Sequence, residues 1–152
     1  MKLERLMTVR ALLGEPQTIG AMGRGVRSIG VVVDGTFEGE RLRGKVVPPG
    51  ADWIVIGEGG MGQLDVRLTL VTDDGANIFM YYTGLLELND AMTSAMASGG
   101  ETQFGDNYFI SQPRFETGTE KYAWLNHVVA VGEGRAVPGG VEYDVYHCIP
   151  GE

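Results

Sequence analysis

The segment 64–71 constrains the fold of this chain more than any other part of the sequence. Apolar and polar residues alternate through it without a break, in the order Leu64, Asp65, Val66, Arg67, Leu68, Thr69, Leu70. Strict alternation predicts a strand with one apolar face and one polar face. The turn residues Asp73-Asp74-Gly75 follow, and Asn77–Thr83 is again strand-like, so we expect an antiparallel hairpin here.

The rest of the chain has the composition of short strands joined by glycine turns. Glycine makes up 24 of the 152 residues, about twice the usual share of roughly 7%. The glycines have no period of three, which excludes a collagen-like chain. A hydrophobic content of 43% excludes a disordered chain, and no apolar stretch approaches the roughly 20 residues of a membrane helix. We expect a single domain over residues 1–152.

Several further segments are β-branched, short and bounded by turn residues. They predict strands at Ser28–Val33, Thr36–Val47, Asp52–Ile56, Asn107–Phe115, Tyr122–Val131 and Val141–Ile149. Asp34-Gly35 and Pro48-Pro49-Gly50 are predicted as turns, and residues 3–13 fit either a short helix or a strand. About eight closely spaced strands predict an all-β, mainly antiparallel sandwich or a closed or nearly closed barrel, and a barrel leaves no sheet edge exposed.

Segment 85–106 differs from these strands. Met92 and Met96 lie one helical turn apart, the pair Asn89-Asp90 can cap a short helix, and Gly99-Gly100 can end it. The segment is long for a hairpin connection, which usually has about 2–5 residues. We therefore expect one short helix here, which acts either as a mobile lid on the rim of the pocket or as a fixed plug at one end of the barrel.

Charge and cysteine content limit the partners and the compartment. The formal net charge is −8, and the basic residues are mixed with acidic ones, so neither nucleic acid nor an anionic membrane is an expected partner. The single cysteine, Cys148, cannot form an internal disulfide, which fits a reducing compartment. Residues 1–5 carry an early negative charge and no apolar core segment of a signal, so we expect no signal or transit peptide. We expect a cytoplasmic protein.

Neither a nucleotide site nor a metal site is predicted from the sequence. Residues 57–62 match the dinucleotide pattern G-x-G-x-x-G, but an alternating strand follows them instead of the helix that would receive a pyrophosphate. A hairpin loop is the better interpretation. The histidines His127 and His147 do not have a metal-binding spacing, and there is no second cysteine. We therefore expect neither a metal site nor any other cofactor.

Three charged residues are candidates for catalysis. Asp52 follows a proline-glycine turn, and a carboxyl group held against apolar surface has a raised pKa and can act as an acid or a base. Asp65 and Arg67 share one face of their strand. They are either a solvated surface pair or part of a polar cavity inside the barrel, where Arg67 would hold a substrate carboxylate and Asp65 would be an alternative acid or base.

Aromatic side chains with polar tips are candidates for ligand binding. Tyr122, Trp124 and Asn126 share a face if their segment is extended, and such a face makes a ligand wall, with Trp124 as a plain core residue the strong alternative. Tyr82 or Tyr122 would donate a hydrogen bond to developing negative charge, which makes Tyr122 a further catalytic candidate. Trp53, next to Asp52, completes the candidates for ligand binding.

Several ordered motifs resemble one known family, called domain of unknown function 3237. They are Gly35–Gly44, Pro49–Trp53, Leu64–Arg67, Thr72–Gly75, Pro113–Gly118, Tyr122–Asn126 and Gly139–Tyr146. The resemblance covers roughly residues 18–147 and departs at 86–106, which is longer and richer in methionine. It implies a single-domain antiparallel β-barrel with a pocket at one end. Some relatives belong to aromatic-compound catabolism, which implies cofactor-free lyase or decarboxylase chemistry.

Three functions follow as hypotheses. The first is a cofactor-free enzyme of lyase, decarboxylase or isomerase type acting on a small aromatic or apolar acid. The second is a protein of the same fold that binds a small ligand without chemistry, and the third is an interaction module with a filled interior. The first two need a pocket of roughly 300 Å³ or more that contains Arg67 and a carboxylate. The expected partner is a small molecule, and a homo-oligomer is one option for the assembly.

Overall fold

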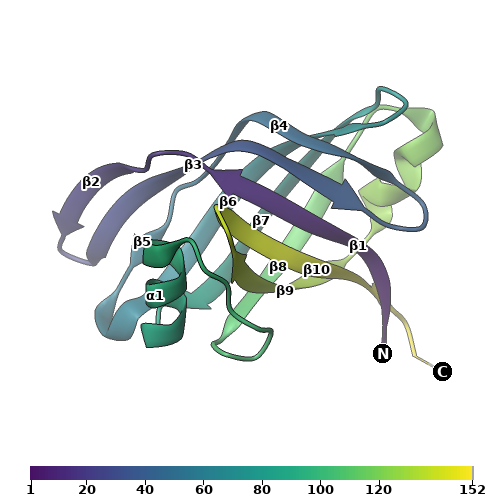
Figure 1. Ribbon diagram of the computed structural model, residues 1–152. Coiled ribbons are helices and arrows are strands. Elements are labelled where there is room, and N and C mark those ends of the chain that lie inside the picture. The colour runs from purple at the N-terminus through teal and green to yellow at the C-terminus, as the bar shows by residue number, and fades with distance from the viewer. Residues whose placement is uncertain (152) are drawn as a thin grey trace.

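Eight antiparallel strands close into a barrel-like ring in the computed structural model, which describes residues 1–151 (Figure 1). The ring runs in the order β1-β10-β9-β8-β7-β6-β4-β3, and β3 pairs with β1 to close it. The strands are β1 (Lys2–Leu13), β3 (Gly25–Glu38), β4 (Arg43–Asp52), β6 (Met61–Thr72), β7 (Asn77–Glu87), β8 (Phe109–Glu116), β9 (Ala130–Val137) and β10 (Gly140–Ile149). This confirms the predicted mainly antiparallel barrel of about eight strands.

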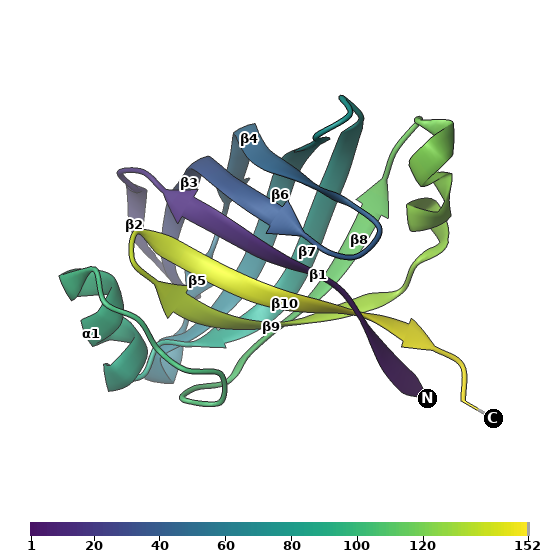
Figure 2. The same ribbon diagram turned by 45° about the vertical axis from the view of Figure 1, so that its right-hand side comes forward.

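Two short strands and three short helices complete the described structure. Strand β2 (Gln17–Met22) pairs with β3 outside the ring, and β5 (Val55–Ile56) pairs with β3 and β6. The one-turn 3₁₀ helix η1 (Glu58–Gly60) precedes β6. Helix α1 (Asp90–Ser98) and the 3₁₀ helix η2 (Glu120–His127) lie at opposite ends of the barrel (Figure 2). None of the helices described over residues 1–151 is long and apolar enough to cross a membrane.

The hairpin of β6 and β7 has the predicted register. The two strands pair continuously from Met61 opposite Glu87 to Val71 opposite Asn77. The apolar residues of β6 point into the barrel, where Leu68 and Leu70 are almost completely buried. Burying a leucine side chain contributes about 1.5–3 kcal/mol, so this face anchors the core.

Helix α1 begins and ends where the sequence predicts. The Asn89 side chain accepts a hydrogen bond from the Met92 amide at 3.1 Å, as an N-cap does. Gly99 has a left-handed backbone (φ 70°), and its amide bonds to the Ala95 carbonyl. Met92 is fully buried and attaches the helix to the barrel. Whether α1 moves as a lid or stays as a plug is still a prediction.

Three segments differ from the sequence predictions or decide between them. Residues 3–13 form a strand, β1. The predicted turn at Asp34-Gly35 is wrong: both residues lie inside β3, and a Cβ at Gly35 would collide with the Arg10 carbonyl. Glycine there permits the close approach of β3 to β1 that closes the ring. The predicted turn at 48–50 is also wrong, because these residues form a bulge inside β4.

The predicted strand Tyr122–Val131 is wrong over most of its length. Residues 120–127 form helix η2, and the strand starts only at Ala130. Tyr122 and Leu125 are both buried, and this spacing of three residues suits a 3₁₀ turn and not a strand. Packing against the end of the barrel therefore overrides the local preference of these residues for extended backbone.

Candidate functional site

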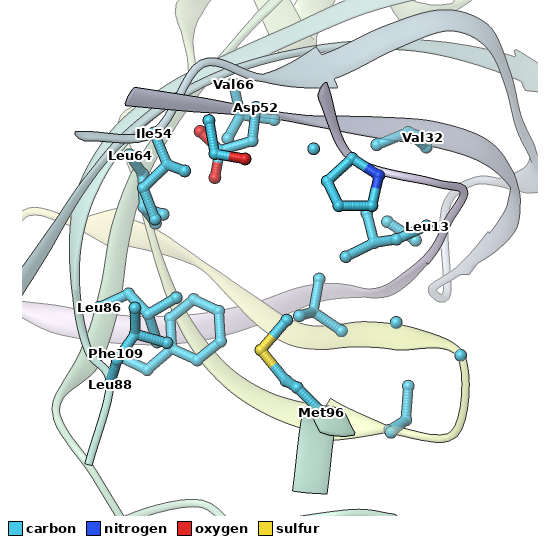
Figure 3. A pocket seen from close by; sticks show the side chains of 18 of the residues that line it. Leu13, Val32, Asp52, Ile54, Leu64, Val66, Leu86, Leu88, Met96 and Phe109 are labelled. Atoms are coloured by element: carbon cyan, nitrogen blue, oxygen red, sulfur yellow. The ribbon is translucent and has the colours of Figure 1, made fainter. Parts of the chain in front are cut away.

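A cavity of about 490 Å³ occupies the end of the barrel next to α1. Most of the side chains that surround it are apolar (Figure 3), and they come from nearly every strand of the ring. The apolar side chains include Leu13, Val32, Ile54, Leu64, Val66, Leu86, Leu88, Met96 and Phe109. This volume lies within the roughly 300–1,000 Å³ of small-molecule sites.

Polar side chains in the cavity are few. Asp52, Ser28, Tyr82 and Tyr143 line it, and within residues 1–151 none of the lining residues is a lysine, arginine or histidine. Asp52 is therefore the only formally charged side chain among the described lining residues. Figure 3 shows it on the wall next to Val66 and Ile54, with Met96 across the cavity.

Strand register places Asp52 on this wall. Gly30 of β3 pairs with Asp52, Asp52 pairs with Val66 of β6, and Val66 pairs with Tyr82 of β7. Directly paired residues share a face of the sheet, so all four face the interior. They form one row across the barrel wall.

The bulge at residues 48–50 decides the depth of this carboxylate. Val46 pairs with Leu70 and Asp52 pairs with Val66, so β4 takes six steps where β6 takes four. A regular ladder would place Asp52 opposite Leu64, nearer the open end. The bulge therefore moves the carboxyl group deeper, to the level of Tyr82.

The apolar surroundings change the acidity of Asp52. Burial raises its pKa to about 6, the Asp65 backbone amide opposes this effect by donating a hydrogen bond, and the negative charge of Asp65 raises the pKa further. The amide bonds to Oδ1 of Asp52 at 3.0 Å. A carboxyl group with a pKa near neutrality can both donate and accept a proton at physiological pH.

Two buried tyrosines lie near this carboxyl group. The rings of Tyr82 and Tyr143 meet edge to face with centroids 5.3 Å apart. Burial raises the pKa of both phenols, and the negative charge of Asp52 raises both further. Both hydroxyls therefore stay protonated. Sequence reasoning missed Tyr143, although it alternates with the buried Val141 and Val145 along β10.

The structure places Asp65 and Arg67 outside the cavity. Their side chains are 47% and 52% exposed, with 3.5 Å between Arg67 Nη2 and Asp65 Oδ1. The Arg67 guanidinium lies over the Trp53 ring at 4.9 Å, on the same outer surface. Of the two alternatives, the solvated pair is correct. The expectation that Arg67 holds a substrate carboxylate in this cavity is wrong, because the apolar face of β6 points inward.

Tyr122, Trp124 and Asn126 lie at the opposite end, in η2, so they do not form a wall of the cavity. The Tyr122 hydroxyl is 2.9 Å from both carboxylate oxygens of Asp74. The guanidinium of Arg41 lies 3.5 Å from the centroid of the Trp124 ring. Asn126 bonds to the amide and the carbonyl of Thr117. These contacts attach η2 to the barrel. Of the predicted site residues, only Asp52 and Tyr82 line the cavity.

The glycine-rich segment 57–62 forms the loop that sequence context predicts. It contains η1 and leads directly into β6, so no helix begins where a pyrophosphate would bind. Among the residues that the structure describes, no group of three or more histidine, cysteine, aspartate and glutamate side chains is arranged to hold a metal ion.

Comparisons with known proteins agree with the fold and with the sequence resemblance. The model of the family described as "Protein of unknown function (DUF3237)" matches residues 1–148. A UPF0311 protein of Rhodopseudomonas palustris is 29% identical over 149 residues, covering 98% of this chain and 97% of the relative. The crystal structure of this relative, a conserved protein of unknown function, has a TM-score of 0.88 and covers 97% of both chains.

Two further crystal structures have the same architecture. A beta-barrel like protein from Acinetobacter baumannii is 34% identical with a TM-score of 0.81, covering 96% of this chain and 94% of that one. An enzyme from Penicillium herquei is 21% identical with a TM-score of 0.70, covering 97% and 94%. At that identity the likeness concerns the fold alone.

Proposed function

Because the chain belongs to the DUF3237 family, whose description assigns no activity, we propose a function from its cavity. The protein is a cofactor-free enzyme of the isomerase or lyase type that acts on a small aromatic or otherwise apolar molecule without a contact from Arg67, which lies outside the cavity. Asp52 moves a proton on this molecule inside the barrel. The observation that carries the proposal is the Asp52 carboxyl group, whose pKa is raised to about 6 by burial in an otherwise apolar cavity.

The surroundings of Asp52 suit proton transfer. The Asp65 amide holds Oδ1, which fixes the orientation of the carboxyl group, and within the described chain no other hydrogen bond to this carboxyl group is found. The second oxygen is thus available to a ligand. A positioned general acid or base contributes roughly 10²–10⁴-fold to a rate when its pKa is close to the operating pH.

The tyrosine pair supplies the second part of the chemistry. When a proton is removed from a substrate that carries a carbonyl or hydroxyl group, the negative charge that remains on the substrate commonly lies on the oxygen of that group. The phenols of Tyr82 and Tyr143 remain protonated, and Asp52 is close enough to influence both. A hydrogen bond from either hydroxyl would stabilise that oxygen, and it would be strong because the apolar walls exclude water. The enzyme from Penicillium herquei indicates that this fold can host catalysis.

Hydrogen exchange into ligands tests the proposal. The protein is incubated in D₂O with a panel of aromatic ketones and phenols, and mass spectrometry follows deuterium uptake into each compound. We expect Asp52→Asn to lower the rate by roughly 10²–10⁴-fold. Asp73→Asn is the matched control, because this carboxylate is exposed in the turn between β6 and β7, at the other end of the barrel. A full rate in Asp52→Asn, or no turnover by the wild type across the panel, would contradict the enzyme proposal.

A second candidate is a binding protein without chemistry. The predominance of apolar side chains in the cavity favours it, because such walls retain a ligand without any reacting group. Thermal stabilisation by a ligand without turnover, equal in the wild type and in Asp52→Asn, would support this alternative.

A further inference from the structure

Charge in the cavity limits the ligands that it accepts. Among the described lining residues there is no cation, and Asp52 is the only acid. A carboxylate ligand would lose its hydration on entry and find no ion pair to replace it, and it would meet an acidic group. An uncharged ligand has neither disadvantage.

The polar groups are concentrated at one level of the cavity. Asp52 and Tyr82 lie in the same row of the wall. Tyr143 lies on β10, which does not pair with β7, and its aromatic ring contacts that of Tyr82. Toward α1 the wall consists of apolar side chains such as Leu88 and Met96 (Figure 3). The serine hydroxyl of Ser28, on β3, is the remaining polar side chain among the described lining residues. A ligand therefore has its deepest hydrogen-bonding place at Asp52 and Tyr82, the Ser28 hydroxyl nearer the opening, and otherwise apolar walls around its body.

Gly30 makes space beside this place. It pairs with Asp52, and a Cβ built on it would have its nearest neighbours at 3.9 Å, the Cβ and carbonyl oxygen of Asp52. Its φ angle lies outside the left-handed region, so the backbone does not require glycine. By contrast, a Cβ at Gly84 would collide with the Ile110 carbonyl. Glycine at position 84 serves strand packing, whereas glycine at position 30 leaves open space next to the carboxyl group.

We propose that the cavity selects uncharged, largely apolar molecules that present one hydroxyl or carbonyl group to Asp52, and that Gly30 determines how large a molecule fits there. This inference rests on the proposed function in placing the ligand in the same cavity. It replaces the acid that the sequence suggested with a neutral compound, and it assigns a residue that determines specificity.

Matched probes test the selectivity for charge. The probes are 2-naphthol, 2-acetylnaphthalene and 2-naphthoate, which share one skeleton, and binding is measured by calorimetry at pH 8. We expect the two neutral compounds to bind at least about 10-fold more tightly than the carboxylate, which corresponds to about 1.4 kcal/mol. Equal or tighter binding of 2-naphthoate, or no binding of either neutral probe at millimolar concentration, would overturn the inference.

Substitutions at glycine test the role of position 30. Gly30→Ala and Gly30→Val should weaken 2-naphthol binding progressively, by about 5-fold and more than 10-fold, and should favour phenol over 2-naphthol relative to the wild type. Gly118→Ala is the control, because a Cβ there meets nothing within 4 Å and the site is at the other end of the barrel. Unchanged affinity in both Gly30 variants would overturn the assignment, and the unfolding midpoint of Gly30→Ala verifies that the fold is intact.

The two proposals fail separately. Neutral probes that bind selectively but exchange no hydrogen would leave the ligand class in place and contradict the enzyme. Turnover that depends on Asp52, combined with tight binding of 2-naphthoate, would support the enzyme and contradict the selectivity for neutral ligands.

Discussion

The two ends of the barrel each place an aspartate near a buried tyrosine, with opposite electrostatic results. At the η2 end, Asp74 accepts hydrogen bonds from Lys121 at 2.6 Å, Thr72 at 2.6 Å and Tyr122 at 2.9 Å. These contacts, that of Lys121 first, hold the pKa of Asp74 well below its ordinary value. At the cavity end, Asp52 accepts one hydrogen bond, from the backbone amide of Asp65, and burial raises its pKa to about 6.

The difference shows which carboxylate serves the fold. Asp74 is exposed and fully paired, and its contacts attach η2 to the end of the barrel. Asp52 lies against apolar side chains with one oxygen available, an arrangement that costs stability. Residues that cost stability and have a perturbed pKa in a cavity are candidates for function. The contrast can be tested by substituting each member.

The largest expected effect is on stability at the cavity end. A folded-state pKa of about 6, compared with an ordinary value of 3.8, means that ionised Asp52 costs the folded state about 3 kcal/mol. Because the folded-state pKa is raised, the contribution of Asp52 to the free energy of unfolding is fully present below about pH 3.8. This contribution is lost as the pH rises through about 6. Asp52→Asn should therefore raise the free energy of unfolding by up to about 3 kcal/mol at pH 8.

Urea unfolding at pH 4 and pH 8 measures this effect. The substitution should have little effect at pH 4, where the wild-type carboxyl group is already largely neutral in the folded state. An equal effect of Asp52→Asn at the two pH values would contradict the raised pKa.

Substitution of Asp74, at the η2 end, should lower the stability of the protein, and by less than Asp52→Asn raises it. Asp74→Asn removes the ion pair with Lys121 and the charged acceptor of Tyr122, so the unfolding midpoint should fall at neutral pH. The folded-state pKa is lowered, so this contribution is present above the ordinary pKa of 3.8 and is lost as the pH falls toward the folded-state value. Thermal unfolding across pH 2–7 checks the prediction, and stabilisation by Asp74→Asn at neutral pH would refute the comparison.

The smallest expected effect concerns the dynamics of the two terminal helices. Both α1 and η2 contain residues buried against the barrel, Met92 and Leu125. We expect slow amide exchange in both helices of the free protein. Because Met96 lines the cavity, a ligand such as 2-naphthol should slow exchange in α1 and leave η2 unchanged. Rapid exchange across 85–106 in the free protein would instead indicate a mobile lid. Protection of α1 as strong as that of β6 would indicate a fixed plug.

Local patterns in the sequence determined the elements that depend on near neighbours. The alternation of apolar and polar residues defined the hairpin of β6 and β7, because successive side chains of a strand point to the apolar interior and to solvent in turn. The cap residues Asn89 and Gly99 defined α1, because they satisfy backbone groups within a few residues of themselves. The prediction that a carboxyl group at Asp52 has a raised pKa also followed from general chemistry and agrees with the structure.

Only the tertiary structure decided which polar residues meet. Ring closure brings Tyr143 of β10 against Tyr82 of β7, and no local pattern links strands so far apart in the chain. The bulge in β4 sets the depth of Asp52, and packing converts the predicted strand around Tyr122 into η2. Alternation shows that Arg67 and Val66 point in opposite directions, but the closure of the barrel decides which direction is inside. Long-range strand pairing thus assembles the site, whereas local patterns in short segments of the sequence determine where the separate strands and the helix form.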